Sequence, residues 1–289
     1  MRKCKMKASY VALMALLLGT NNVFSADIAT DIRNAAAGPD ISNGGHFEVG
    51  LGFDYTNSAR LTTSDNEDGA SVTLEIGGAY RYNGLFIELS QGTLDGLSIG
   101  YHLWSNDTWA IDVLGSSING VLTEEDDEDD NRSNRSEAQR NNALIDRDTF
   151  YNGAGFRATA YFGNTIFQYR LVSDIHDDNG VMSTLRLGRS WQFRNWNFHS
   201  VVSASYASAK TSRYWYGITE SEATTRFSEY DLDSTMTYTA EIGLTYPISE
   251  HVVFRSSARY TQFSNDIQDS PLVDSSGSTY IATSINYVF

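Results

Sequence analysis

The sequence predicts an all-β protein, an antiparallel transmembrane β-barrel of about 12 strands with short periplasmic turns and long extracellular loops. Three features of the chain predict this fold. Apolar and polar residues alternate with a period of two from residue 45 onward, short and long connections alternate along the chain, and aromatic residues gather at the ends of the predicted strands and at the last residue, Phe289. Membrane barrels combine these three features.

The period of two is the primary evidence for strands. It is clearest between Phe47 and Tyr55, where every second residue is apolar and the residues between are polar or glycine. Most of the segments approach the ~9–11 residues that a tilted membrane strand requires. The predicted strands are 45–55, 71–82, 84–91, 96–104, 108–115, 149–162, 164–173, 180–191, 195–208, 235–246, 250–262 and 278–289.

The connections give the barrel two different rims. Even-numbered strands are followed by short turns, and odd-numbered strands are mostly followed by longer loops. The short turns are Asn83, 105–107, Gly163, 192–194 and 247–249, and the loops are 56–70, 92–95, 116–148, 174–179, 209–234 and 263–277. Short turns on one side, together with both chain ends, are typical of outer-membrane barrels.

Alternation by itself does not exclude a soluble sandwich or a lipocalin-like barrel with an apolar interior. Aromatic residues at strand ends favour the membrane alternative, because they form the interfacial girdles of such barrels. These residues are Tyr55, Tyr80, Tyr82, Trp104, Trp109, Phe162, Trp191, Trp196, Tyr206, Tyr246 and Tyr260. The alternating C-terminal residues Ile285, Tyr287 and Phe289 are predicted to act as an assembly signal, read by the barrel-assembly machinery.

The first 25 residues are predicted to be a cleaved signal peptide. Four basic residues (Arg2, Lys3, Lys5 and Lys7) precede an apolar run of ten residues, Tyr10 to Gly19, which is too short to span a bilayer as a helix. Cleavage after Ser25 would leave an N-terminal periplasmic segment, 26–44, before a barrel of residues 45–289.

Charge and cysteine content exclude several classes of function. The net charge is −15, and loss of the four basic residues of the signal would make it −19. Nucleic-acid binding needs the opposite sign. The one cysteine, Cys4, would leave with the signal, so we expect no disulfide. We also expect no cofactor and no metal, because no His, Cys and carboxylate set has ligand spacing.

The polar face of the strands, taken as the lumen, has an uneven charge distribution. Acidic residues lie on the early strands: Glu48, Asp54, Glu75, Glu88 and Asp112. Basic residues lie on the later strands: Arg157, Arg170, Arg186, Arg255 and Arg259, with Glu241 as an exception. Facing walls of opposite sign could block the lumen by ion pairs, since charges leaving water need partners. The alternative is a narrow pore with a transverse field.

Catalytic and binding motifs are weak. Ser98 shares a face with His102, and Ser203 with His199, but the sequence places no aspartate to orient either histidine. We therefore expect a protein that is not an enzyme. The acidic run 124–130 is predicted to be a solvated segment, with weak binding of divalent cations bridging to lipopolysaccharide as the alternative.

The 209–234 loop contains a possible capping box. Thr219 can accept the N–H of Glu222, whose carboxylate can reach back. The sequence therefore predicts a short helix in this loop, folded over the barrel mouth as a structural plug, with a recognition surface as the alternative. The loop motif consists of Tyr214, Trp215, Tyr216, Gly217, Thr219, Glu222 and Ala223.

The same stretch resembles a signature of the MipA/OmpV family of MltA-interacting proteins and relatives. Residues 153–157, 161–163 and 168–171 and the end of the chain are also similar, whereas the first strand lacks the proline-containing element that the family often carries. The resemblance implies an outer-membrane protein in contact with lipids and lipopolysaccharide. It also implies a scaffold joining a lytic transglycosylase to a penicillin-binding protein, or a surface-interaction protein.

The leading hypothesis is therefore a non-enzymatic envelope scaffold or surface-interaction protein. A narrow channel is the second hypothesis, and a membrane-embedded hydrolase is a remote third.

Overall fold

The computed structural model describes residues 35–39, 42–57, 59, 69–90, 96–117, 152–175, 180–223 and 227–289. The predicted signal peptide and the acidic run 124–130 lie outside these residues. No helix in the described part of the chain is long and apolar enough to cross a membrane, a finding that does not bear on β-barrels.

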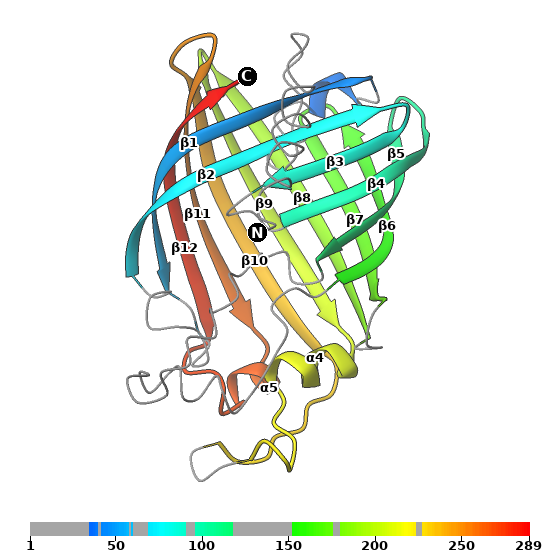
Figure 1. The fold of residues 1–289 in the computed structure, drawn as a ribbon, viewed down its shortest axis with the longest axis vertical. Helices are drawn as coiled ribbons and strands as arrows, with labels where there is room; N and C mark the ends of the chain where they lie inside the picture. The colour runs from blue at the N-terminus through cyan, green and yellow to red at the C-terminus, as the bar shows by residue number, and fades with distance from the viewer. Residues whose placement is uncertain are drawn as a thin grey trace, which may run out of the picture.

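Twelve antiparallel strands close into one barrel, which confirms the predicted fold (Figure 1). The strands are β1 Gly44–Asn57, β2 Gly69–Tyr82, β3 Leu85–Ser90, β4 Gly96–Ser105, β5 Trp109–Ser117, β6 Asn152–Phe162, β7 Thr165–Asp174, β8 Val181–Phe193, β9 Trp196–Ala207, β10 Thr235–Pro247, β11 Val252–Phe263 and β12 Gly277–Val288. Each overlaps its predicted range. β12 pairs with both β11 and β1, so the sheet has no free edge.

Burial shows which face of the strands points outward. Large apolar side chains such as Leu51, Val72 and Ile242 are 66–78 % exposed, whereas Arg157 and Gln168 on the opposite face are 8 % and 2 % exposed. A soluble barrel would bury its apolar face, so this inverted arrangement is that of a barrel whose outer surface is solvated by lipid.

Residues with positive φ form the tight turns at the short-turn rim of the barrel. Asn83 and Gly84 between β2 and β3 both have positive φ, at 50° and 85°, as a type I′ hairpin turn requires. Arg194 between β8 and β9 and Gly163 between β6 and β7 also have positive φ. These tight turns lie at the rim that also holds the C-terminus (Figure 1).

The opposite rim carries the described parts of the loops after β9 and β11, with two helices, α4 Ala209–Tyr216 and α5 Asn265–Gln268 (Figure 1). The short 3₁₀ helix η1, Ala35–Ala37, precedes the barrel. Exposed aromatic side chains mark both rims, for example Trp104 and Trp191 near the short turns and Tyr206 and Tyr238 near the long loops.

Candidate functional site: the closed lumen

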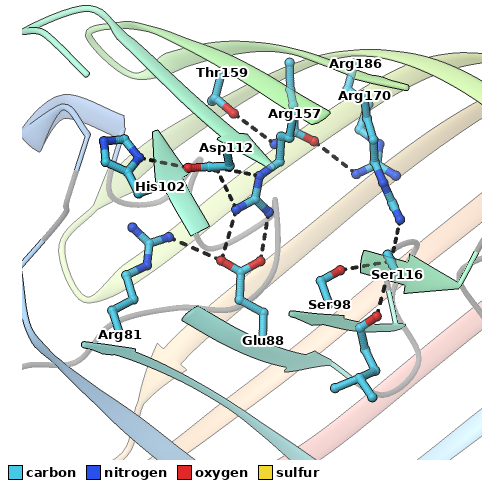
Figure 2. A network of polar contacts seen from close by, with 12 residues as sticks. Arg81, Glu88, Ser98, His102, Asp112, Ser116, Arg157, Thr159, Arg170 and Arg186 are labelled. Carbon is cyan, nitrogen blue, oxygen red and sulfur yellow. Dashed lines mark hydrogen bonds and ion pairs between the residues drawn. The ribbon is translucent and has the colours of Figure 1, made fainter. Parts of the chain in front are cut away.

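Arg157 on β6 is the centre of a buried ion-pair cluster in the lumen (Figure 2). Its Nη1 and Nη2 donate to the two carboxylate oxygens of Glu88 on β3, at 2.8 and 3.2 Å. Its Nε donates to Oδ2 of Asp112 on β5 at 3.0 Å. Arg81 on β2 adds a second guanidinium, 3.2 Å from Glu88. Bidentate, charge-assisted bonds of this kind give fixed geometry.

A second cluster surrounds Glu241 on β10. Nη2 of Arg259 lies 2.7 Å from Oε2 of Glu241, and Nε2 of His199 lies 3.3 Å from Oε1. All three side chains are at most 14 % exposed. Buried charges are stable only when they are paired and hydrogen-bonded, so both clusters depend on their complete set of partners.

Some ion pairs join neighbouring strands, such as Glu241 on β10 and Arg259 on β11. Others join strands that are not neighbours, such as Arg157 on β6 and Glu88 on β3. Asp112 and Arg157 lie where the acidic strands meet the basic ones, directly opposite each other in the β5–β6 ladder. Glu48 pairs with Arg255 at the other junction, on either side of β12. Opposite charges thus meet at the borders of the two charged sectors.

The remaining predicted luminal charges make other contacts. Arg170 donates to the hydroxyl of Ser116, and Arg186 donates to Oε1 of Gln168 at 3.2 Å. Glu75 lies over Gly52, where an added Cβ would come within 2.9 Å of its Oε1. Both arginines are at most 7 % exposed.

α4 closes the lumen at the long-loop rim. Ser208 caps the helix by accepting the Thr211 N–H. The Trp215 side chain is buried against Phe86, Leu114 and Val172, which point inward from β3, β5 and β7. These inward apolar side chains interrupt the polar face of their strands, and the sequence analysis missed their role as a seat for Trp215.

The 209–234 loop contains a short helix, as predicted, but this helix is α4, which ends at Tyr216. Residues 220–222 form a turn, so no helix starts at the capping pattern of Thr219. The Glu222 carboxylate does accept the Thr219 N–H at 2.8 Å, as the capping box requires. The Thr219 hydroxyl, however, bonds to that same carboxylate at 2.8 Å and does not accept a backbone N–H. Gly217 ends α4 by donating its N–H to Arg213, and Ala223 donates its N–H to the Thr219 carbonyl.

The two loops after β9 and β11 pack on each other and form a cap. Ile218, Phe227 and Leu272 make a small buried cluster, and a single β-bridge joins Ile218 to Tyr230. Ser270 donates to the Tyr216 carbonyl at 2.7 Å. The Tyr230 hydroxyl donates to the Asp266 carbonyl at 2.8 Å, and burial together with nearby aspartates raises its pKa.

η1 narrows the opposite mouth. Ala35 is 1 % exposed and packs against Ile166 and Val201, both buried side chains on the inner wall, with Tyr161 beside them. A part of the predicted N-terminal segment therefore contacts the inner wall of the barrel near the short-turn rim.

The C-terminal residues complete the barrel wall. Phe289 donates its backbone N–H to the Phe47 carbonyl at 2.9 Å, and its ring contacts Tyr287 at a centroid distance of 4.8 Å. Ile285, Tyr287 and Phe289 are 45–56 % exposed and face outward. Across the described ranges, no group of three or more His, Cys, Asp or Glu is placed to hold a metal ion.

Comparison with known proteins gives the family. The family described as MltA-interacting protein MipA matches residues 49–289. Outer membrane protein YiaT, termed putative, of Escherichia coli is 29 % identical over 120 residues, or 41 % of this chain and 49 % of its own. OmpV of Vibrio cholerae is 29 % identical over 85 residues, covering 29 % and 33 %. These matches span only about a third to a half of the relatives.

The MltA-interacting protein of Escherichia coli is 22 % identical over 200 residues, covering 67 % of this chain and 75 % of its own. Among solved structures, the CymD monoaromatic hydrocarbon channel aligns with a TM-score of 0.40 at 13 % identity, covering 94 % and 95 % of the two chains. The NanC porin aligns with a TM-score of 0.43 at 8 % identity, covering 83 % and 98 %.

Proposed function

The chain belongs to the MltA-interacting protein MipA family of outer-membrane barrels, and from this premise we propose that it is an envelope scaffold that acts by binding partners and not by passing solutes. The observation that carries the proposal is the set of buried side chains inside the described part of the barrel. The Arg157 cluster occupies the inner wall, Trp215 is seated in the long-loop end, and Ala35 is buried in the short-turn end.

A murein transglycosylase is the proposed partner, because one relative is named for its interaction with MltA. A penicillin-binding protein is the second, from the family resemblance. Both would approach the short-turn rim, which faces the periplasm in outer-membrane barrels. That rim presents the exposed turn 248–251 between β10 and β11, and Ile248 is 53 % exposed there.

The experiment is site-specific photocrosslinking in intact envelopes. A photoreactive residue at Ile248 should capture a murein enzyme, whereas the same residue at Glu229 in the exposed long-loop cap should not. Capture of the same partner from both rims, or from neither, would contradict the proposed scaffold. Steady conductance of the purified barrel would favour the channel alternative.

We also propose that Ile285, Tyr287 and Phe289 form the assembly signal. Their outward row at the end of β12 supports this role, since it is available before the barrel closes. Deletion of Phe289 should leave protease-sensitive periplasmic protein, while deletion of the exposed Glu250 should have a smaller effect. If the variant lacking Phe289 showed the normal heat-modifiable migration on gels, the proposed assembly signal would be overturned.

A further inference from the structure

His102 links a serine to an aspartate at the short-turn end of the lumen. Nδ1 of His102 lies 2.8 Å from Oδ1 of Asp112, and its Nε2 lies 3.0 Å from the hydroxyl of Ser105. Figure 2 shows the ring directed at Asp112, whose other oxygen accepts from Arg157 at 3.0 Å. Sequence reasoning paired His102 with Ser98, but Ser98 instead bonds to Ser116 at 3.0 Å.

A β-bulge creates this juxtaposition. The β4–β5 register runs regularly to His102 opposite Asp112 and then shifts, so that Trp104 is opposite Ile111. Leu103 and Trp104 are consequently both exposed on the outer surface, at 55 % and 50 %. Regular alternation would turn Ser105 outward, away from His102. Bulges are frequent beside active sites because they re-aim one side chain.

The hydrogen-bond roles follow from the chemistry of the three groups. An ionised carboxylate only accepts, so the contact with Asp112 requires the His102 proton on Nδ1. Nε2 is then the acceptor and Ser105 must donate its O–H to it. A serine bonded to a histidine base that is itself oriented by a third group is the arrangement of an activated nucleophile.

We propose that Ser105, His102 and Asp112 form a nucleophilic serine site that hydrolyses carboxylic esters entering through the short-turn mouth of the barrel. This activity is additional to the scaffold role, and it revises the expectation of no catalysis, which rested on the lack of an orienting aspartate. Ser105 is the last residue of β4 and is partly exposed, so the rim gives access to it.

The reaction would follow the usual two steps of acyl transfer. The Ser105 oxygen bonds to the ester carbonyl carbon while its proton passes to Nε2 of His102, and the alcohol then leaves with that proton as its C–O bond breaks. Water, deprotonated by His102, attacks the acyl-serine, releases the carboxylic acid and restores Ser105.

The Glu241 cluster provides an internal control. His199 also bonds to a carboxylate that is held by an arginine. Its second ring nitrogen, Nδ1, is buried and has no hydrogen-bond partner in the described part of the chain. The two histidines thus differ in the presence of a serine, and only His102 should support nucleophilic reactivity.

The test uses the full barrel folded in detergent micelles, a fluorophosphonate label and p-nitrophenyl acetate. We expect the label on Ser105 by peptide mass spectrometry, and none in S105A. H102A should slow both labelling and ester hydrolysis by about 10²-fold or more, the usual contribution of a general base. D112N should also be slower, whereas S98A and H199A should react as the wild type does.

Heat-modifiable migration must show that every variant is folded. Equal labelling of S105A, a label on another serine, or no reaction above that of the heat-denatured protein would overturn the proposal. None of these results depends on a murein partner, so the scaffold proposal is tested separately.

Discussion

The two luminal clusters have different groups at their centres, an arginine in the first and a carboxylate in the second. In the first, one arginine, Arg157, is shared by two carboxylates, Glu88 and Asp112. In the second, one carboxylate, Glu241, is shared by Arg259 and His199. Removal of Arg157 from the first would leave two buried carboxylates, Glu88 in contact with Arg81 and Asp112 in contact with His102. Removal of Glu241 from the second would leave one guanidinium and one imidazole without that carboxylate.

This difference indicates that the loss of stability on breaking a buried cluster depends on the groups that remain. Carboxylates that lose their partner must be protonated or hydrated inside the barrel, whereas a neutral histidine needs only a hydrogen bond. The Arg157 cluster should therefore be the more sensitive of the two.

The largest expected effect is that of Arg157→Met. It should lower the free energy of unfolding by about 3–5 kcal/mol, because Asp112 loses its guanidinium contact and Glu88 keeps only the guanidinium of Arg81 among the contacts described above. The urea concentration at the midpoint of unfolding, determined in lipid vesicles, measures this loss of stability. Arg194→Met, at an exposed turn over the Phe193 ring, is the matched control and should change little. Equal midpoints for the two variants would show that the luminal pairs do not hold the barrel.

Trp215→Ala should have the next largest effect, and a local one. The indole is seated on Phe86, Leu114 and Val172, so its loss should cost up to about 3 kcal/mol in the cap and leave the strand ladder intact. Hydrogen exchange of α4 should increase while that of β7 stays unchanged. Trp215→Phe keeps an aromatic ring and should show a weaker effect. Unchanged exchange in the alanine variant would mean that Trp215 does not anchor α4.

Glu241→Gln removes the central carboxylate of the second cluster and tests whether this cluster is the less sensitive of the two. The amide oxygen can still accept a hydrogen bond from Arg259, so we expect a loss of about 1–3 kcal/mol in the free energy of unfolding, below that of Arg157→Met. The urea midpoint is again the measurement, with the exposed Glu250→Gln as control. A loss larger than that of Arg157→Met would reverse the ranking.

His199→Gln is expected to have the smallest effect. One bond of 3.3 Å to Glu241 is lost, which corresponds to about 0.5–1.5 kcal/mol. The temperature at which the migration of the protein on gels changes can resolve this difference from the wild type. A larger loss would indicate that the contact between His199 and Glu241 contributes more than one ordinary hydrogen bond.

Period-two alternation was sufficient to predict all twelve strands, since it reports directly which side chains face lipid. It could not predict the ion pairs, which depend on barrel closure. Arg255 and Glu48 are 207 residues apart in the chain and meet only because β12 closes on β1. Ser105 was assigned to a turn, because Leu103 and Trp104 break the alternation at the bulge.

The loop helix shows a different limit. The capping pattern at Thr219 suggested a helix start. The helix lies earlier in the chain, where Ser208 caps it and Trp215 packs in a cluster of apolar side chains. The apolar side chains of that cluster come from three strands that are distant in the chain. Tertiary contacts therefore decide the position of the helix, and a local pattern cannot predict this position.

The central claim is that the lumen is closed, and conductance across a planar bilayer tests it most directly. The wild-type barrel should stay silent at voltages at which a porin conducts, and the double variant Arg157→Met, Trp215→Ala should open conducting events by removing the luminal cluster and the long-loop seat together. Steady conductance of the wild type, at the level of the double variant, would contradict the account.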